Sequence, residues 1–206
     1  MTSSPRSSAS YAGSLVLLRH GETEWSKSGQ HTGLTDIPLT ERGEDLARHS
    51  ASMLKGRRFV AVLTSPLVRA RRTAELAGFE GAEVDDRLVE WDYGAYEGLT
   101  TPEIRERLGY PWTVFHDGVV AGDTPGESIH EVAARVRGVI DRVRPLLEHG
   151  DVALVGHGHC LRVLASVYLE QDPCFGAQLT LGAGSVSVLG LEHGLPAVES
   201  WNQTPG

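Results

Sequence analysis

A buried strand that ends in an Arg-His-Gly loop constrains this chain more than any other feature. Residues 15–18 are consecutive aliphatic residues, and Arg19, His20 and Gly21 follow them directly. Such a run is typical of a parallel strand covered by helices on both faces, and ligands of open α/β sheets bind at the carboxyl ends of the strands. There, Arg19 can hold a phosphate and disfavour protonation of His20. We therefore interpret His20 as a nucleophile facing an anion, with Gly21 letting backbone N–H groups approach it.

The length and composition fit one ordinary domain. The chain has 206 residues, of which 40% are hydrophobic and 22% are charged, and this suits a single well-buried α/β domain. Residues 1–14 are rich in serine and lack the apolar centre of a secretory signal, so we expect them to form a disordered leader. The predicted domain covers residues 15–206 and includes a cap segment at about residues 99–127.

The charge balance excludes several classes of partner. A formal charge of −8 disfavours a broad basic surface for nucleic acid or anionic membranes, and the apolar runs are too short to cross a bilayer. Cys160 and Cys174 have no metal-ligand spacing and suit reduced thiols. We therefore expect a cytoplasmic protein that binds neither nucleic acid nor a membrane. An anion site must come from a local group of arginine and histidine side chains.

Strands and helices alternate along the chain. After the first strand, a second buried strand is expected at residues 59–63, a short strand near residues 83–85, an apolar strand at residues 151–156 and a final strand at residues 185–191. Helices are expected at residues 40–55, 66–77, 128–147 and 160–170, with a short one from Thr101 and a kink or end at Pro145. Residues 22–38 lack a helical period and are expected to form a long ordered loop. The alternation predicts an α/β fold, a three-layer α/β/α sandwich with a mainly parallel central sheet.

Titratable side chains follow several of these strands. Arg69 lies just after the second strand, His157 follows the strand at residues 151–156, and Glu90 lies in an acidic and aromatic segment. Two arginines and two imidazoles at one point can neutralise a phosphoryl group, whose transfer needs positioning and charge stabilisation. One imidazole can attack phosphorus while a carboxylic acid protonates the leaving alkoxide. This chemistry needs no metal or other cofactor, and the chain contains no P-loop.

Six sequence blocks occur in the order found in a known family. They are residues 17–23 (LLRHGET), 64–70 (TSPLVRA), 90–94 (EWDYG), 97–98 (EG), 126–128 (GES) and 156–158 (GHG). Over about residues 15–195 the chain resembles the phosphatase branch of the histidine phosphatase superfamily, which has the phosphoglycerate-mutase-like fold. The resemblance implies a phosphoric monoester hydrolase that forms a phosphohistidine intermediate.

The resemblance also implies roles for individual residues. His20 is the transiently phosphorylated nucleophile and Glu90 is the proton donor. The phosphoryl oxygens are surrounded by Arg19, Arg69 and His157. Contacts to phosphate or substrate are implied for Ser26, Thr32, Gly33 and Tyr93, with Gln30 and His159 as nearby candidates.

Three positions favour a hydrolase over a mutase. Where the cofactor-dependent mutases of this family carry cations for the substrate carboxylate, this chain has Gln30, Thr101 and the pair His116-Asp117. Asp117 is expected to repel an acid. The first loop resembles that of sedoheptulose-bisphosphatase-type members, which implies a sugar phosphate or bisphosphate substrate. We expect its far end to be held by Lys27, His31 or His116.

Other interpretations stay open at this point. One is a 2,3-bisphosphoglycerate-dependent phosphoglycerate mutase, and another is a phosphoprotein or phosphohistidine phosphatase module. His20 and His157 can also be read as hydrogen-bonded core residues, and Glu90 as the ion-pair partner of an arginine. The preferred partner is a small phosphomonoester. The sequence leaves open whether the chain forms a homo-oligomer.

Overall fold

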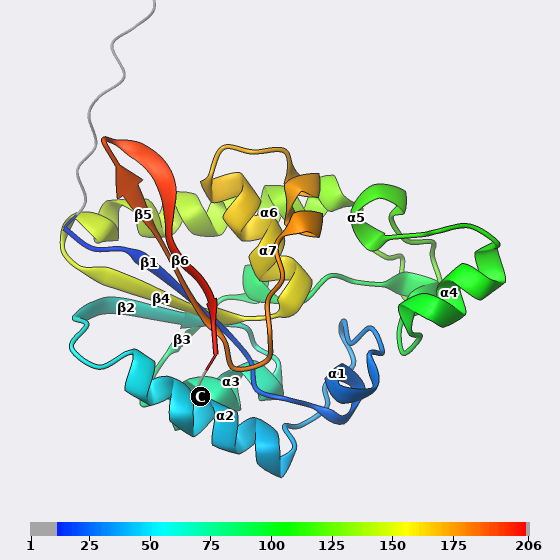
Figure 1. Ribbon diagram of the computed structural model, residues 1–206, viewed down its shortest axis with the longest axis horizontal. Coiled ribbons are helices and arrows are strands. Elements are labelled where there is room, and N and C mark those ends of the chain that lie inside the picture. Colours follow the sequence, from blue (N-terminus) through cyan, green and yellow to red (C-terminus); the bar gives the residue numbers. More distant parts are fainter. Residues whose placement is uncertain (1–11, 205–206) are drawn as a thin grey trace, which may run out of the picture.

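The computed structural model describes residues 12–204 and contains one six-stranded sheet between two layers of helices (Figure 1). Its strands are β1 (Leu15–Arg19), β2 (Phe59–Thr64), β3 (Glu83–Val84), β4 (Asp151–Gly156), β5 (Val186–Glu192) and β6 (Leu195–Gln203). They lie in the order β3-β2-β4-β1-β5-β6. The first four of these are parallel, whereas β5 and β6 are antiparallel to their neighbours. The predicted three-layer α/β fold with a mainly parallel sheet is confirmed.

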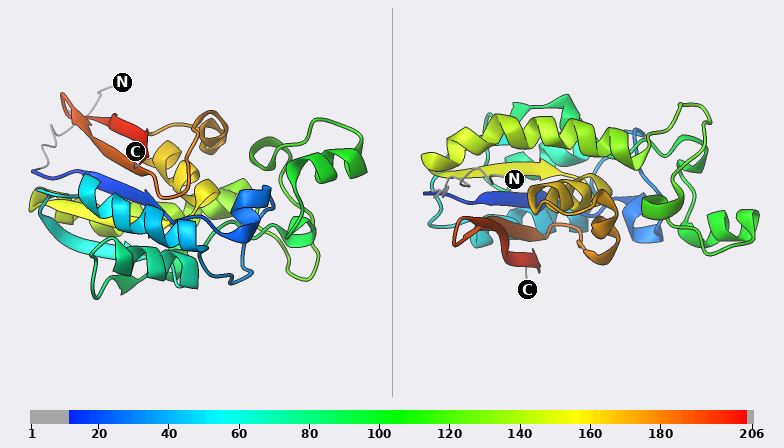
Figure 2. Two further views of the ribbon diagram at one scale, coloured as in Figure 1. Left: turned by 60° about the horizontal axis from the view of Figure 1, so that its bottom comes forward. Right: turned by 90° about the horizontal axis from the view of Figure 1, so that it is seen from above.

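The long helices cover the two faces of the sheet in pairs. Figures 1 and 2 show α2 (Glu41–Met53) and α3 (Val68–Leu76) on one face, and α6 (Ile129–Val143) and α7 (Gly158–Tyr168) on the other. Strand β1 contributes side chains to both faces of the sheet, because successive side chains of a strand point to opposite faces. Leu15 and Leu17 join the larger apolar cluster with α6 and α7, while Val16 and Leu18 join the smaller one with α2 and α3. The expectation of a strand buried on both faces is confirmed.

Several predicted boundaries differ from the structure. Residues 22–38 are not purely loop, because α1 (Glu24–Ser28) forms there behind a capping box made by Thr23 and Ser26. Helix α3 begins at Val68, two residues after Pro66, and its N-cap is Leu67 instead of the expected Ser65. Helix α6 gives way to a 3₁₀ turn that contains Pro145, as predicted. Strand β6 was not predicted, because its residues are mostly only half-buried and lack a clear apolar alternation.

The cap segment lies beyond the carboxyl ends of the parallel strands (Figure 2). It contains α4 (Thr101–Leu108) and α5 (Val114–Asp117), and its aromatic residues Trp112 and Phe115 belong to the larger apolar cluster. The predicted leader falls mainly outside the described residues, which begin at residue 12. Gly13 and Ser14 donate backbone hydrogen bonds to Leu147 and Asp151. In residues 12–204, no helix is both long and apolar enough to cross a membrane.

The central position of β1 predicts a large cost for core truncation. Leu17 is fully buried between β4 and β5, so Leu17→Ala should lower the free energy of unfolding by about 2–5 kcal/mol. Val198 on β6 is 44% exposed, and Val198→Ala should change the free energy by no more than about 0.5 kcal/mol. Urea denaturation followed by fluorescence measures both values. Equal losses in the two variants would contradict this account of the core.

Candidate active site

His20 emerges from the carboxyl end of β1 with one ring nitrogen already engaged. Its backbone N–H donates to Gly156 at 2.9 Å, which fixes the residue beside the end of β4. The ring atom Nδ1 lies 2.7 Å from the carbonyl oxygen of Gly21. Because a carbonyl can only accept, Nδ1 carries the proton and Nε2 keeps its lone pair. Burial, and then the charges of Arg19 and Arg69, lower the pKa of His20 well below its ordinary value. The imidazole is therefore neutral and able to act as a nucleophile at pH 7.

A second imidazole, His157, packs beside His20. The two ring centroids lie 5.1 Å apart. Arg69 donates from Nε to His157 Nδ1 at 3.1 Å, so His157 carries its proton on Nε2 and donates to Ser65 Oγ at 2.7 Å. Arg69 also donates to backbone carbonyls at residues 32, 33 and 35 of the first loop. This network ties the loop after β1 to the ends of β2 and β4.

Glu90 is held by the amino end of α7. One carboxylate oxygen accepts from the backbone N–H groups of Trp91 at 2.9 Å and Cys160 at 2.8 Å. The other oxygen accepts from His159 N–H at 3.0 Å, and Glu90 lines the same cavity as His20. The first N–H groups of a helix have no partner within the helix and are available to donate to an oxygen atom. The carboxyl group is therefore fixed in position facing the cavity.

Arg135 of α6 holds the segment that carries Glu90. Its guanidinium donates to the carbonyls of Arg87, Val89 and Glu90 at 2.8–3.1 Å. It also forms a two-pronged ion pair with Glu127, whose second oxygen accepts from the backbone of the acidic segment at residue 92. The Gly-Glu-Ser block of the sequence is thus a brace for the acidic segment.

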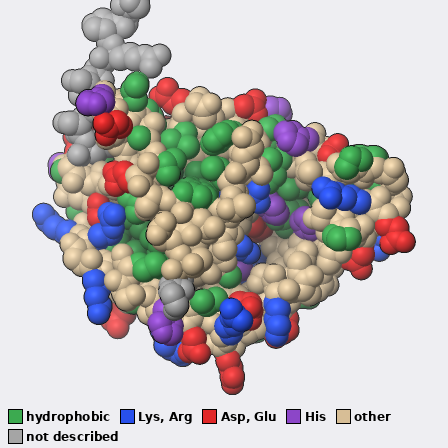
Figure 3. Space-filling model, in the orientation of Figure 1, with side chains coloured by type: hydrophobic (Ala, Val, Ile, Leu, Met, Phe, Trp, Pro, Cys, Tyr) green, Lys and Arg blue, Asp and Glu red, His purple; other side chains and the backbone are tan. Residues whose placement is uncertain are grey.

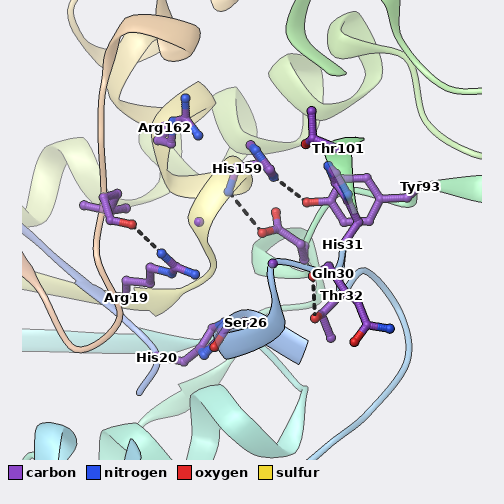
Figure 4. A pocket seen from close by; sticks show the side chains of 14 residues that line it. Arg19, His20, Ser26, Gln30, His31, Thr32, Tyr93, Thr101, His159 and Arg162 are labelled. Atoms are coloured by element: carbon purple, nitrogen blue, oxygen red, sulfur yellow. Dashed lines mark hydrogen bonds between the residues drawn. The ribbon is translucent and has the colours of Figure 1, made fainter. Parts of the chain in front are cut away.

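A cavity opens where these elements meet the cap. In the space-filling view of Figure 3, histidine and arginine side chains line a hollow between the body of the protein and the cap. Of the predicted residues, the cavity is lined by Arg19, His20, Ser26, Gln30, Thr32, Glu90, Tyr93 and His159 (Figure 4). Arg69 and His157 lie beneath His20 and are completely buried. The structure therefore brings the predicted acid and nucleophile to one wall, with two further cationic or polar groups below.

Two predicted glycines have a packing role instead of a place in the cavity lining. A Cβ atom at Gly21 would lie 2.1 Å from the carbonyl oxygen of Gly43 in α2, and the Gly21 N–H donates to Thr73. A Cβ atom at Gly33 would lie 2.5 Å from a carboxylate oxygen of Glu97, to which the Gly33 N–H donates. Close approach of neighbouring groups, and not contact with a ligand, requires glycine at both positions.

The structure separates the three residues expected to hold the far end of the substrate. His31 lines the cavity, but Lys27 lies in a separate surface hollow and His116 is exposed outside the cavity lining. Asp117 accepts from the backbone N–H of Thr113 and is likewise not in the lining, so it repels no ligand there. Sequence reasoning missed Arg162, which lines the cavity from α7. The sequence pattern that could have identified Arg162 is a single cationic side chain in a mostly apolar helix that begins at the predicted His-Gly motif.

The cavity wall between the catalytic groups and the cap is uncharged. Burial lowers the pKa of His31 and lowers that of His159 well below its ordinary value, so both rings are neutral at pH 7. The rings are stacked with centroids 5.9 Å apart. His159 Nδ1 lies 2.5 Å from the Tyr93 hydroxyl, and burial raises the pKa of that hydroxyl so that it keeps its proton. This wall offers hydrogen bonds without charge.

Comparisons with known proteins agree with this arrangement. Residues 15–204 match the sequence profile of the histidine phosphatase superfamily (branch 1). An acid phosphatase of Mycobacterium tuberculosis is 38% identical over 183 residues, which are 88% of this chain and 88% of the relative. A sedoheptulose 1,7-bisphosphatase of Saccharomyces cerevisiae is 36% identical over 179 residues, which are 74% of this chain and 66% of the relative.

Solved structures show the same architecture. The product of an open reading frame of Mycobacterium tuberculosis matches with a TM-score of 0.88 and 35% identity, over 95% of this chain and 100% of that one. A mycobacterial glucosyl-3-phosphoglycerate phosphatase matches with a TM-score of 0.80 and 29% identity, over 94% of this chain and 100% of that one.

The buried neutral histidines predict that acid destabilises the fold. The pKa values of His20, His157 and His159 are lowered, so the unfolded chain binds protons that the folded chain rejects. Their contribution is fully present above the unfolded pKa of about 6.5 and is lost as pH falls from there towards the folded values. Urea denaturation between pH 7.5 and 5 should show this loss.

The pH range from 7.5 to 5 separates the effect of the histidines on the free energy of unfolding from the effect of the carboxylates. Hydrogen bonding to Arg87 lowers the pKa of Asp85 to about 2. A carboxyl group of this kind loses its contribution to the free energy of unfolding only as the pH falls below its ordinary pKa of about 4. The variant His49→Gln changes an exposed histidine and should keep the same pH profile. A free energy of unfolding that stays constant from pH 7.5 to 5 would show that the three rings titrate normally.

Proposed function

Because this chain belongs to the histidine phosphatase superfamily, we propose that it is a metal-independent phosphomonoesterase whose His20 carries the phosphoryl group as a covalent intermediate. The phosphatase class predicted from the sequence motifs agrees with the relatives that carry phosphatase names. The observation that carries the mechanism is the state of His20. Its Nδ1–H is fixed by the Gly21 carbonyl, its charge is suppressed, and it lines the same cavity as Glu90.

The proposed reaction has two steps. The lone pair on His20 Nε2 attacks phosphorus, the P–O ester bond breaks, and the leaving alkoxide takes a proton from the Glu90 carboxylic acid. A water molecule then attacks the phosphohistidine, and the Glu90 carboxylate accepts the proton of this water. The N–P bond breaks, inorganic phosphate leaves, and His20 returns to its neutral form. No cofactor is consumed.

Positive charge around His20 supports the transfer. Arg19 lines the cavity, and its Nε atom is buried without a hydrogen-bond partner in residues 12–204. An unsatisfied buried donor is costly, and a phosphoryl oxygen satisfies it. Arg69 and His157 lie beneath His20 and stabilise the negative charge of the phosphoryl group from that side. These groups are pre-organised by the hydrogen bonds that hold the first loop, so little reorganisation accompanies the reaction.

The substrate that fits this cavity best is a small phosphorylated metabolite such as a sugar phosphate or bisphosphate. The uncharged wall of Gln30, His31, Thr101, Tyr93 and His159 suits hydroxyl groups. Relatives named as a sedoheptulose bisphosphatase and a glucosyl-3-phosphoglycerate phosphatase point to the same class. The uncharged side chains of Gln30 and Thr101 disfavour a mutase that needs cations at these positions, and the overhanging cap disfavours a phosphoprotein substrate. We place the enzyme in the cytoplasm, as its composition predicts.

The assignment of His20 predicts complete loss of turnover on its removal. His20→Ala should lower kcat by about 10³-fold or more, because the proposed phosphohistidine cannot form without this imidazole. Rapid acid-free quenching with ³²P-labelled substrate should label the wild-type protein and leave this variant unlabelled. His49→Ala, an exposed change, is the control and should keep full labelling. An acid-labile phosphoenzyme that persists in His20→Ala would refute the assignment.

The assignment of Glu90 predicts a dependence on the leaving group. Glu90→Gln should slow hydrolysis of a sugar phosphate by about 10²–10⁴-fold, because an alkoxide needs protonation. The same change should slow release of p-nitrophenolate much less, since this leaving group is stable as an anion. Single-turnover rates with both substrates, measured with a chelator present, give the comparison. Equal losses for the two leaving groups would instead indicate a structural role for Glu90.

A further inference from the structure

Strand β6 is irregular where it lies beside the start of β5. Between the pair of Val186 with Gln203 and the pair of Val188 with Ser200, β5 advances by two residues and β6 by three, so β6 bulges. Within this bulge Asn202 has a φ of 55°, in the left-handed region that asparagine adopts more readily than most residues. Bulges in natural sheets often redirect a side chain next to an active site. The proposed mechanism gives Asn202 no function.

The side chain of Asn202 holds the loop that leads into β5, which comprises residues 179–185. Asn202 Oδ1 accepts from the backbone N–H of Gly182 at 2.6 Å, and its Nδ2 donates to Thr180 Oγ1 at 3.5 Å. The backbone N–H of Asn202 donates to Ser187 Oγ at 2.9 Å. The bulge is thereby fixed to β5, and it directs the amide of Asn202 at the middle of the loop.

The same loop holds the guanidinium of Arg19. The carbonyl oxygen of Leu181 accepts from Arg19 Nη1, and Figure 4 draws this bond as the dashed line to Arg19. It is the only hydrogen bond of this guanidinium within residues 12–204, where the buried Nε has no partner. Both Arg19 and Leu181 line the cavity. The placement of the guanidinium for a phosphoryl group therefore depends on where the Leu181 carbonyl points.

One peptide group connects Asn202 with Arg19. The carbonyl of Leu181 and the N–H of Gly182 belong to the same planar peptide unit, in which they point in opposite directions. Asn202 binds the N–H end of this unit and Arg19 binds its carbonyl end. Glycine restricts the rotation of a neighbouring peptide less than any other residue does. The hydrogen bond from Gly182 to Asn202 therefore decides the direction of the carbonyl that Arg19 uses.

The neighbouring peptide groups of the loop have other supports. The Thr180 carbonyl accepts from Trp201 Nε1 at 2.5 Å. The Gly182 carbonyl accepts from the backbone N–H of Ser185 at 3.2 Å and from its hydroxyl at 2.7 Å. Removal of the Asn202 amide therefore leaves the loop attached on both sides and frees one peptide group between them.

The backbone around the proposed nucleophile is also supported without Asn202. Figure 1 shows the loop turning at the carboxyl end of β1 before β5 starts. There the Ser185 carbonyl accepts from the backbone N–H of Arg19 at 3.1 Å, and the Gly184 N–H donates to the His20 carbonyl at 3.0 Å. These bonds fix the main chain of both residues. The contribution of Asn202 is therefore specific to the side chain of Arg19.

We propose that Asn202 is a positioning residue for phosphoryl transfer, because it orients the peptide between Leu181 and Gly182 that holds the Arg19 guanidinium. The inference rests on the proposed function, in which Arg19 binds the transferred phosphoryl group. Asn202 does not line the cavity, so it acts through Arg19 and not on the substrate. The bulge of β6 thus serves a group on β1, with β5 between the two strands.

Two substitutions at Asn202 separate its hydrogen bond from its backbone conformation. Asn202→Gly tolerates the positive φ and removes the side-chain amide, whereas Asn202→Asp keeps the Oδ1 acceptor and loses only the longer bond to Thr180. The matched control is His193→Gly in the turn before β6. His193 has a φ of 52°, is exposed and does not line the cavity.

The removal of the amide should impair binding and transfer of the phosphoryl group. Asn202→Gly should lower kcat/KM by about tenfold or more for both p-nitrophenyl phosphate and phenyl phosphate, because Arg19 acts on the phosphoryl group and not on the leaving group. The dissociation constant of inorganic phosphate, measured by calorimetry, should rise in the same variant. Asn202→Asp should stay within about threefold of the wild type in kcat/KM, and His193→Gly within about twofold. Midpoints of thermal unfolding should stay within about 4 °C of the wild type for all three variants.

A double-mutant cycle identifies the group through which Asn202 acts. Arg19→Gln removes the guanidinium that the Leu181 carbonyl orients. In this background Asn202→Gly should lower kcat/KM by less than about twofold, because a residue that acts through Arg19 has no effect once Arg19 is removed. A tenfold loss in both backgrounds would place the action of Asn202 elsewhere and overturn the proposal.

Two other results would also overturn the proposal. One is an Asn202→Gly variant with wild-type kcat/KM and wild-type phosphate affinity, and the other is an equal loss in Asn202→Gly and Asn202→Asp. Phosphohistidine labelling of the wild type is measured in parallel. A labelled wild type together with either result rejects the role of Asn202 and keeps the proposed function, whereas an unlabelled wild type removes both.

Discussion

Parallel pairing of β1 with β4 is the constraint on which the site depends. The register opposes Arg19 to Gly156, so the residues that follow the two strands, His20 and His157, emerge side by side. Their strands are covered by apolar clusters on both faces, and burial at the strand ends disfavours the charged form of both imidazoles. The same burial that stabilises the sheet therefore keeps His20, the proposed nucleophile, neutral. Packing and reactivity have one physical cause here.

The second constraint is the amino end of α7. This helix starts directly after His157, and its first N–H groups hold both oxygens of Glu90. Glu90 comes from a segment without regular strand or helix structure, so it needs support from elsewhere, and Arg135 supplies it through three backbone carbonyls. The proposed acid is thus positioned by the start of α7, and the proposed nucleophile by the end of β1, which pairs with the strand before α7. A rigid scaffold allows an irregular segment to carry a catalytic group.

Uncompensated cations distinguish the cavity from the rest of this acidic chain. The formal charge is −8, yet the cavity concentrates arginines that have no carboxylate partner. Such an arrangement is unfavourable for the empty protein and favourable for an anionic ligand, because the ligand supplies the missing charge. The neutral histidines between Arg19 and Arg162 then separate two regions of positive charge.

The sequence by itself determined the first five strands, the long helices and the types of side chain at the strand ends, because these depend on local periodicity, caps and chain order. The capping box formed by Ser128 and Glu131 predicted the start of α6. The apolar run before Arg19 predicted a strand that is buried on both faces. Only the tertiary structure decided that Gly21 serves packing against α2 and that Arg162, instead of Lys27 or His116, faces the cavity. These outcomes depend on contacts between residues far apart in the chain. A local pattern shows which residues can bear charge, but packing decides which of those charges stay unpaired.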